Sequence, residues 1–277
     1  MHISLDLALG RLKVLFNSFI REFTGASAAY SLQDLAVGSG STRVVRVRRS
    51  SDNAEDDFAA SEVANGTLTT WVGSGNDGFV ETWYDQSGNG RDATQSTAGN
   101  QPKIVSGGAL VLRNGKPTVD FYNNSSFVTG AFTDGSAHSS FAVINNQAAN
   151  SNRKVFYAKA EFPNKGFVWN YRGDQTAGKY DSVSFDGSTR SLIYNNSSSP
   201  LYALVSTFIN SSKKLFINGS TAASSSNSFV ADDGTLTIGS PSFGTGFDIQ
   251  EIIIYDSDQT DNRPDIETNI NDRYEIY

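Results

Sequence analysis

Apolar and polar residues alternate in short runs along most of the chain, and Gly, Asn, Ser and Asp separate the runs. Alternation with a period of two is typical of strands that bury one face, and the separating residues favour turns. The dipeptides Asn114-Gly115 and Asn218-Gly219 are of the kind that closes two-residue hairpins. We predict strands over residues 42–49, 79–84, 103–105, 109–112, 119–122, 127–128, 139–144, 154–158, 166–171, 201–209, 213–217, 236–239 and 247–255.

Three segments have helical spacing instead. Residues 1–24 carry large apolar side chains at alternating intervals of four and three, which forms a heptad seam. The seam residues are Leu5, Leu9, Leu12, Phe16, Phe19 and Phe23. A Ser cap followed by Ala and Leu predicts a short helix over 27–36. Ile266, Ile270 and Tyr274 predict a closing helix from Asn262, with Pro264 in its first turn, where a missing N–H costs nothing.

Many strands with helices only near the chain ends predict an all-β fold, an antiparallel β-sandwich. We expect one sandwich domain over 25–277, preceded by an amphipathic docking or oligomerisation segment over 1–24. Three heptads are marginal alone, so the seam needs a cover. A short trimeric coiled coil is one cover, and packing of the helix on its own domain is the alternative.

The composition argues against several kinds of site and partner. The 277 residues include no Cys, which excludes disulfides, thiolate metal sites and Cys nucleophiles. A net charge of -7 argues against duplex nucleic acid as a partner. No apolar run approaches the roughly 20 residues needed to cross a bilayer, so we expect no membrane insertion. Asp6, Arg11 and Lys13 interrupt the first apolar stretch, which therefore does not resemble a signal peptide.

The charged and titratable residues offer few candidate centres. Four arginines between Arg43 and Arg49 are followed by four acids between Asp52 and Asp57, and internal salt bridging is favoured over an anion-binding patch. His138, in a Ser/Gly-rich stretch, is interpreted as a solvated loop residue. We predict no metal site and no cofactor. Carboxylates over Asp256–Asp261 offer oxygen ligands for Ca²⁺ as the alternative to solvated turn acids.

One stretch, Phe79 to Thr94, combines a strand with an abrupt polar corner. Aromatic and β-branched residues to Tyr84 favour a strand, and the following Asp, Ser, Gly and Asn residues favour a sharp turn. We expect Trp83 and Tyr84 to enter the sandwich, and the residues from Asp85 to Asp92 to tie the corner.

Several motifs carry a resemblance to known families. The segments 214–219, 236–239 and 247–255 resemble the concanavalin A-like, laminin-G-type jelly roll. The segments 28–32, 45–52 and 82–95, with Tyr84-Asp85-Gln86-Ser87-Gly88 at their centre, resemble the catalytic domain of B-type α-L-arabinofuranosidases. The same succession is similar to virion proteins of bacteriophages, including tail and fibre components. The resemblance covers residues 26–277 and implies a jelly roll.

The arabinofuranosidase resemblance implies a retaining glycosidase with two carboxylates about 5 Å apart. This chain departs from that pattern in three ways. Ser240-Pro241-Ser242 follow Gly239 where the resemblance places the acid/base Asp, and no matching setting surrounds a nucleophilic Glu. The nearest acids, Glu161 and Asp174, stand in unmatched contexts, and the family's adjacent cysteines are missing. We therefore assign no catalytic residue and keep polysaccharide hydrolysis as the alternative function.

The preferred hypothesis is a binding module. A flat aromatic side chain near a carboxylate is a common sugar-binding pair, which selects Trp169, Tyr171, Arg172 and Asp174 as a glycan site. Placement of Trp169 in the core is the alternative. We expect a phage virion-associated protein (tail fibre, spike or capsid-attached) made in the host cytoplasm. Its partners would be other virion proteins through the N-terminal helix, two further copies in a trimer, and host-surface polysaccharide.

Overall fold

The computed structural model describes residues 22–36, 40–122, 125–132, 137–146, 153–158, 166–172, 179–185, 190–194, 200–210, 212–226, 234–239 and 246–277. The seam residues from Leu5 to Phe19 lie outside these ranges, as do Glu161, Asp174 and Ser240–Ser242. Within the described ranges, no helix is both long enough and apolar enough to span a bilayer.

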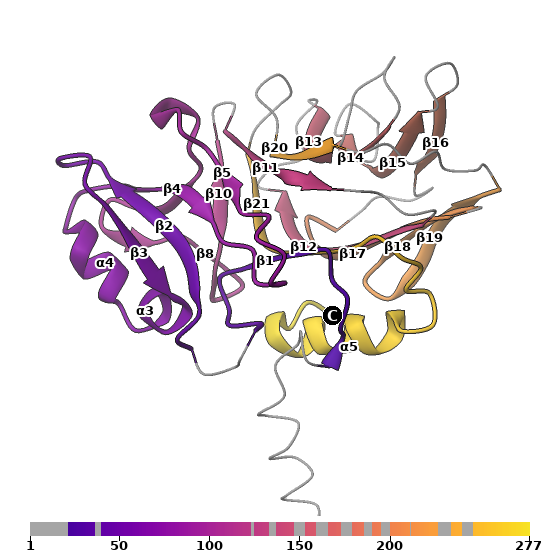
Figure 1. Cartoon of the computed structure of the whole chain (residues 1–277), viewed down its shortest axis with the longest axis horizontal. Coiled ribbons are helices and arrows are strands. Elements are labelled where there is room, and N and C mark those ends of the chain that lie inside the picture. The colour runs from indigo at the N-terminus through magenta and orange to yellow at the C-terminus, as the bar shows by residue number, and fades with distance from the viewer. Residues whose placement is uncertain are drawn as a thin grey trace, which may run out of the picture.

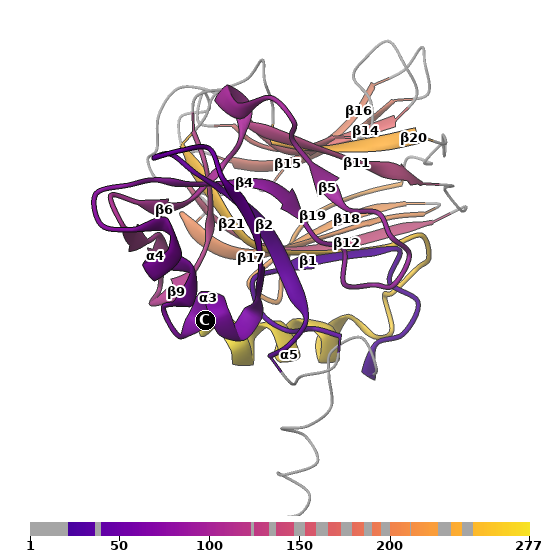
Figure 2. The same cartoon turned by 60° about the vertical axis from the view of Figure 1, so that its left-hand side comes forward.

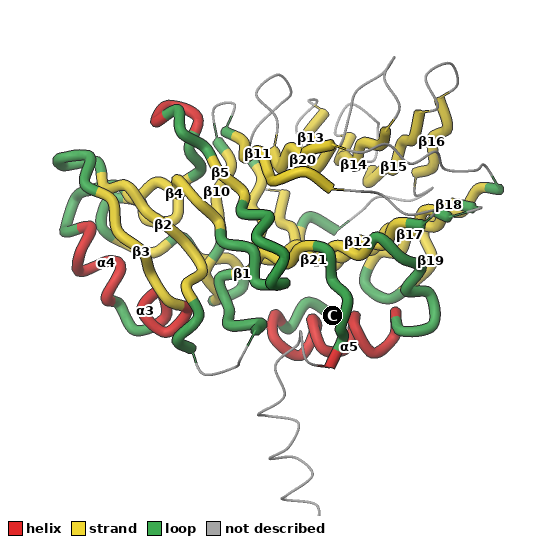
Figure 3. Tube along the Cα trace, in the orientation of Figure 1, coloured by secondary structure: helices red, strands yellow, loops and turns green. Residues whose placement is uncertain are grey.

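The strands form two facing antiparallel layers (Figures 1 and 3), which confirms the predicted β-sandwich. We call the first layer the helix-side sheet. In spatial order it contains β19 (Ser220–Ser225), β18 (Lys213–Ile217), β17 (Tyr202–Ile209), β12 (His138–Asn146) and β21 (Phe247–Tyr255). The free edge of β21 pairs with β1 (Ala28–Ser31) along one part of its length and with β10 (Val119–Phe121) along another.

The second layer is called the far sheet. It contains β16 (Arg190–Tyr194), β15 (Lys179–Phe185), β14 (Gly166–Arg172), β13 (Arg153–Ala158), β20 (Gly234–Gly239), β11 (Ser126–Phe132) and β5 (Ala93–Thr94). The two layers join through β4 (Gly78–Trp83), which pairs with β5 and with β6 (Lys103–Ser106), and β6 reaches β10.

Smaller elements complete the joined end. There β2 (Arg43–Arg49) pairs with β4 and β3 (Glu55–Ala59), and β7 (Ala109–Leu110) pairs with β6. Two short helices, α3 (Ala60–Ala64) and α4 (Thr67–Val72), follow β3, and a 3-10 turn, η1 (Ala98–Asn100), precedes β6. The hairpin of β8 (Leu112–Arg113) and β9 (Lys116–Pro117) leads into β10.

The domain has two apolar cores. The first lies between the sheets, where the Phe121 ring stacks on Phe247 at 5.0 Å and meets Phe127 edge-on at 5.7 Å. The second lies between the helix-side sheet and α5 (Arg263–Tyr274), which runs beneath that sheet (Figure 2). Ile266, Ile270 and Tyr274 are all buried there, which confirms the closing helix predicted from their spacing.

Both ends of the described chain lie against α5. Glu22 accepts a hydrogen bond from Asn269 at 3.3 Å, and Phe23 packs partly on the second core. At the other end, Asn271 donates from its side chain to the Tyr277 carbonyl at 2.8 Å. For Phe23, the one seam residue that is described, the structure shows contact with its own domain.

Strand β21 is buried along its whole length, although it carries two acids. The Asp248 carboxylate accepts from Arg113 Nε at 2.6 Å and from Asn145 Nδ2 at 2.9 Å. The Glu251 carboxylate pairs with Arg273 and accepts from the Tyr274 hydroxyl at 3.1 Å. Because a buried charge is costly unless paired, these bonds lock the β8–β9 hairpin and α5 onto the central strand.

The polar corner after β4 ties down β1. Gln86 donates to the carbonyls of Ser31 and Gln33, both at 2.9 Å, and accepts from the Leu35 N–H at 2.7 Å. The Asp85 carboxylate accepts from the N–H groups of Ala29 (2.9 Å), Ser87 (2.9 Å) and Arg91 (3.0 Å), and from the Ser87 hydroxyl. The corner therefore has the structural role expected from its sequence.

The predicted helix over 27–36 is wrong, because residues 28–31 form β1. Ala28 to Ser31 pair in register with Ile254 to Glu251 of β21, and this ladder outweighs the weak helix preference of Ala and Leu. Helices α3 and α4 were also unpredicted, so helices are not confined to the chain ends. Trp83 is buried as expected, whereas Tyr84 is half-buried and faces away from the core, because adjacent strand residues point to opposite faces.

Both Asn-Gly turns are confirmed. Asn114 and Gly115 have φ values of 48° and 70°, and Asn218 and Gly219 have values of 50° and 75°. Two successive positive φ angles are the geometry of the type I′ turn, which matches the twist of the strands it joins.

Removing the acceptor at the corner should destabilise the fold. We expect Asp85→Ala to lower the free energy of unfolding by about 3 kcal/mol, because four donors lose a charged partner. Urea denaturation measures this. Asp56→Ala is the matched control, since Asp56 is exposed and accepts from the Asp57 N–H alone among the bonds the structure describes, and it should cost under about 0.5 kcal/mol. Equal losses in both variants would contradict the anchoring role.

Candidate functional site

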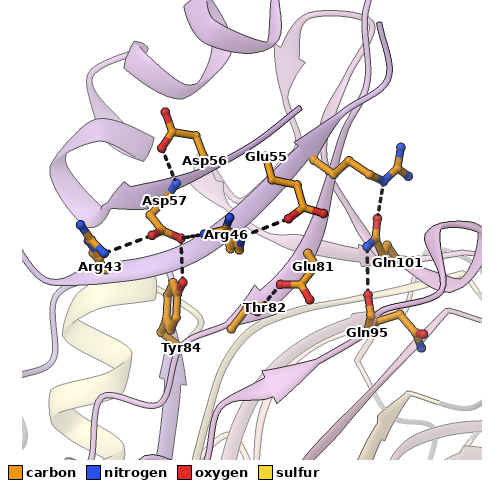
Figure 4. A network of polar contacts seen from close by, with 11 residues as sticks. Arg43, Arg46, Glu55, Asp56, Asp57, Glu81, Thr82, Tyr84, Gln95 and Gln101 are labelled. Atoms are coloured by element: carbon orange, nitrogen blue, oxygen red, sulfur yellow. Dashed lines mark hydrogen bonds and ion pairs between the residues drawn. The ribbon is translucent and has the colours of Figure 1, made fainter. Parts of the chain in front are cut away.

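The charged outer face of β2 is the first candidate that the structure resolves (Figure 4). Arg46 contacts Glu55 and Asp57, each at 3.1 Å, and Arg43 reaches the other oxygen of Asp57 at 3.1 Å. Arg49 pairs with Asp52 at 2.7 Å. This confirms the predicted internal salt bridging for three of the four arginines. Arg48 instead donates to Gln101 at 2.7 Å and lies over the Phe79 ring.

Tyr84 completes this charged face. Its hydroxyl donates to Asp57 at 2.7 Å, and partial burial together with that acceptor raises the pKa of Tyr84 to about 12. Each charge in the cluster thus has a partner of opposite sign or a hydrogen bond. We interpret the cluster as a structural clasp between β2, β3 and β4 rather than as a binding surface.

The strand predicted to bind glycan is β14, in the far sheet. Tyr171 pairs with Tyr180, Asn170 with Asp181 and Trp169 with Ser182 of β15. Arg172 ends β14, and Asp174 lies outside the described residues. The backbone thus places three of the four residues on one strand, beside a second strand that carries polar residues.

Three β15 residues that pair with β14 are buried, although each carries a polar group. Tyr180 and Asp181 are fully buried, and Ser182 is 1% exposed. The Tyr180 hydroxyl accepts from Asn146 at 3.0 Å and donates to the Pro200 carbonyl at 3.1 Å. The interior at this end of the sandwich therefore mixes polar groups with the first apolar core, to which Tyr180 belongs.

The helix-side sheet supplies the other half of this polar interior. Lys213 of β18 is fully buried and pairs with Ile209 of β17, which pairs with His138 of β12. Residues paired across strands share a face, so Lys213 and His138 point into the space between the sheets with Ile209, about 10 Å apart by strand spacing. Ser140 and Thr207, also buried, form the next pair along.

Lys213 and Asp181 connect the two layers electrostatically. Burial lowers the pKa of Lys213 to about 8, and the negative charge of Asp181 partly opposes that shift. A lysine with a pKa near neutrality can hold or release a proton under ordinary conditions, and such groups cluster at functional sites. We therefore define the candidate site, called the polar centre below, as Tyr180, Asp181, Ser182, Lys213 and His138.

Sequence reasoning missed most of the polar centre. His138 is not the solvated loop residue we expected. It is the first residue of β12 and is 3% exposed, because β12 begins one residue before the strand predicted from residue 139. Asp181 lies in a segment with polar and apolar residues mixed, which we did not predict as a strand. The available signal was the alternation of Tyr180, Ser182 and Ser184 with Asp181, Val183 and Phe185.

Among the acids over 256–261, which we considered as Ca²⁺ ligands, Asp258 binds groups of the protein itself. Asp258 accepts from the Thr260 N–H at 2.9 Å, from the Thr260 hydroxyl at 2.6 Å and from Asn210 at 2.8 Å. Partial burial opposes ionisation of Asp258, but these hydrogen bonds lower its pKa overall. In the part of the chain that the structure describes, no three His, Asp or Glu side chains are grouped so that they could hold a metal ion.

Comparison with known structures identifies the fold. A GH54 α-L-arabinofuranosidase soaked with a cyclic sulfate inhibitor matches with a TM-score of 0.63 and 17% sequence identity over 88% of this chain. An arabinofuranosidase complexed with arabinofuranosyl-α-1,2-xylobiose matches with a TM-score of 0.61 and 18% identity over 88% of this chain. The chain spans 62% of each of those structures. At this identity, the likeness shows a shared β-sandwich fold.

Sequence comparison adds nothing to this result. No family profile matches the sequence, and no curated protein matches it either.

The buried lysine predicts an unusual dependence of stability on pH. Lys213 releases its proton near pH 8 when folded, but near its ordinary value of 10.5 when unfolded. The unfolded chain therefore binds more protons between these values, and the free energy of unfolding should rise with pH. We expect a gain of about 1 kcal/mol between pH 7.5 and 9. Above that range the gain is offset, because tyrosines such as Tyr84 and Tyr202 have raised pKa values in the folded chain and ionise first in the unfolded one.

Urea denaturation at several pH values tests this expectation. Lys213→Met should abolish the gain. Lys214→Met, which removes the neighbouring half-buried lysine on the opposite face of β18, should retain it. A wild-type stability that is flat or falls from pH 7.5 to 9 would contradict the assignment.

Proposed function

We propose that this chain is a glycan-binding β-sandwich of the concanavalin A-like jelly-roll type, carried on a bacteriophage particle as a tail-fibre, spike or capsid-attached component. Strand β14 would form the binding surface, with Trp169 and Tyr171 stacking on sugar rings and Arg172 and Asp174 bonding hydroxyl groups. The observation that carries this proposal is the polar centre beside β14, since buried polar and titratable residues of this kind gather at functional sites.

The fold supports the same class of ligand. The arabinofuranosidases that share it include one bound to arabinofuranosyl-α-1,2-xylobiose and one soaked with 4-nitrophenyl α-L-arabinofuranoside. Carbohydrate recognition is thus compatible with this sandwich. Buried tyrosine, serine and charged groups beneath a strand can fix the side chains that meet a sugar, because satisfied polar networks are rigid.

Hydrolysis is less well supported than binding. Cleavage of a glycosidic bond by the retaining route needs two carboxyl groups about 5 Å apart. On β15, the strand beside β14, the described carboxylate is that of Asp181, and its negative charge acts on Lys213. A carboxylate close to a positive charge suits a structural or binding role, whereas the retaining reaction needs a second carboxyl group.

The assembly role rests on the seam of residues 1–24 rather than on the sandwich. A row of large apolar residues at heptad spacing must be covered, and three copies of the segment would cover one another. Partner virion proteins would then hold the trimer, while the sandwich domains meet host-surface polysaccharide. Phe23 marks the boundary, because it packs partly on its own domain.

Truncation of one aromatic side chain tests glycan binding. We expect Trp169→Ala to weaken binding to the preferred ligand on an array of arabinofuranosyl, uronate and sialyl glycans at least tenfold, because a stacked ring is lost. Trp71→Ala is the matched control, since Trp71 packs on Phe58 of β3 at the joined end of the sandwich. Binding that is absent in the wild type, or equal in both variants, would contradict the proposal.

Removal of the seam tests the assembly role. Light scattering after size exclusion should give a trimer for the full chain and a monomer for a chain that begins at Glu22, which keeps Phe23 on its own domain. If the full chain is monomeric as well, the seam has no role in self-association.

A further inference from the structure

The two residues that lead into β1 are bonded on both sides. Ser27 donates from its N–H to the Ile254 carbonyl at 2.7 Å, and its hydroxyl accepts from the Asp256 N–H at 3.0 Å. From the polar corner after β4, Asn89 donates to the carbonyls of Ala26 at 3.0 Å and Ser27 at 3.1 Å. These bonds fix the chain to β21 and to the corner before the ladder of β1 begins.

The same corner holds this part of the chain through charged groups as well. Arg91 donates to the Ser27 carbonyl at 2.6 Å, and the Asp85 carboxylate accepts from the Ala29 N–H at 2.9 Å. The Gln86 N–H donates to the Ala29 carbonyl at 2.8 Å. Hydrogen bonds with an ionised partner are roughly twice as strong as neutral ones. The corner thus places strong bonds at the end of β1 where the chain enters the sheet.

A pull on the N-terminal segment would reach this end of β1 early. The described chain before it is held by the exposed bond from Asn269 to Glu22, by a bond from the Tyr255 hydroxyl to the Phe23 carbonyl at 3.2 Å, and by partial packing of Phe23. Strand β1 has four residues, all paired with β21. A strand pulled away from its neighbour at one end separates pair by pair, so the first pair would carry the whole load if the corner were absent.

We propose that the polar corner is a mechanical clamp, which keeps a pull on residues 1–24 from peeling β1 away from β21. The inference rests on the proposed attachment of those residues to a particle, and it gives the corner a role beyond stabilising the fold. The bonds from Asp85, Asn89 and Arg91 must break together with the first pairs of the ladder, so several bonds share the load. Because the chain has no Cys, these hydrogen bonds act where a disulfide is not available.

A clamp of this kind depends on the direction of the pull. The C-terminus is held elsewhere, where the Asn271 side chain accepts from the N–H groups of Ile276 at 2.9 Å and Tyr277 at 3.0 Å. A pull on residue 277 would therefore load α5 first and leave the corner out of the first step. A corner that only stabilises the fold would instead have the same effect for both ends, which separates the two roles by experiment.

Single-molecule force spectroscopy on the full chain compares the two directions. Val128→Cys, at an exposed position of β11 in the far sheet, supplies the one thiol of the chain as a handle, and the second handle is attached to either terminus. The rate of the first unfolding step is measured at constant force, since forced unfolding is governed by this rate. We expect Asp85→Ala to raise it about tenfold or more for the N-terminal pull, and less than about threefold for the C-terminal pull.

A milder variant decides the question if Asp85→Ala does not fold. Asn89→Ala removes an exposed side chain that donates to Ala26, Ser27 and Ser87, and it should raise the rate for the N-terminal pull about fivefold. Asp56→Ala is again the matched control and should leave the rate unchanged for both pulls.

Three outcomes would overturn the clamp: corner variants that accelerate the first step equally for both pulls, corner variants that accelerate it for neither, or an equal acceleration by Asp56→Ala. The proposed function fails separately, because its tests measure glycan binding and self-association without force. A full chain that is monomeric and binds no glycan would remove the proposed attachment, whereas the dependence on pulling direction would still be measured as described.

Discussion

The whole sandwich depends on how β21 neutralises two acids that have no access to water. Asp248 and Glu251 lie on a strand flanked by β12 on one side and by β1 and β10 on the other. Their arginine partners come from outside the sheet, Arg113 from the β8 hairpin and Arg273 from α5. The two ion pairs are therefore the points at which the hairpin and the helix are fixed to the helix-side sheet, since a buried charge without its partner costs several kcal/mol.

The same principle orders the rest of the molecule. At the corner, Asp85 and Gln86 satisfy backbone groups of β1 that the ladder with β21 leaves open. On the outer face of β2, charges pair in water and stabilise little. In the polar centre, burial lowers the pKa of Lys213, and the negative charge of Asp181 partly opposes that shift. The charged face of β2, the Asp85 corner and the polar centre thus differ in how far their charged groups are exposed to solvent.

The sequence was informative where a local rule decides the structure. The Asn-Gly turns, the spacing of α5 and the strands β17, β18, β20 and β21 each depend on neighbours within a few residues, and all were predicted. It was misleading where a distant partner decides. Ala28 to Ser31 become a strand because β21 is available beside them, more than 200 residues away in the chain.

The candidate site shows the same division. Trp169 and Tyr171 were predicted on a strand over 166–171 from local pattern alone, and the structure confirms that strand, which extends to Arg172. The polar centre could not be found in this way, because Asp181, Lys213 and His138 come from three strands separated by long stretches of sequence. Only the register of β12, β17 and β18 brings the last two into one row.

The contacts of Glu22 and Tyr277 with α5 have a geometric consequence. Residues 22 and 277 therefore both lie on the side of the domain that α5 covers. The far sheet lies on the opposite side of the sandwich (Figures 1 and 2). A partner that bound at either of these residues would thus contact the α5 side and leave β13, β14 and β15 uncovered.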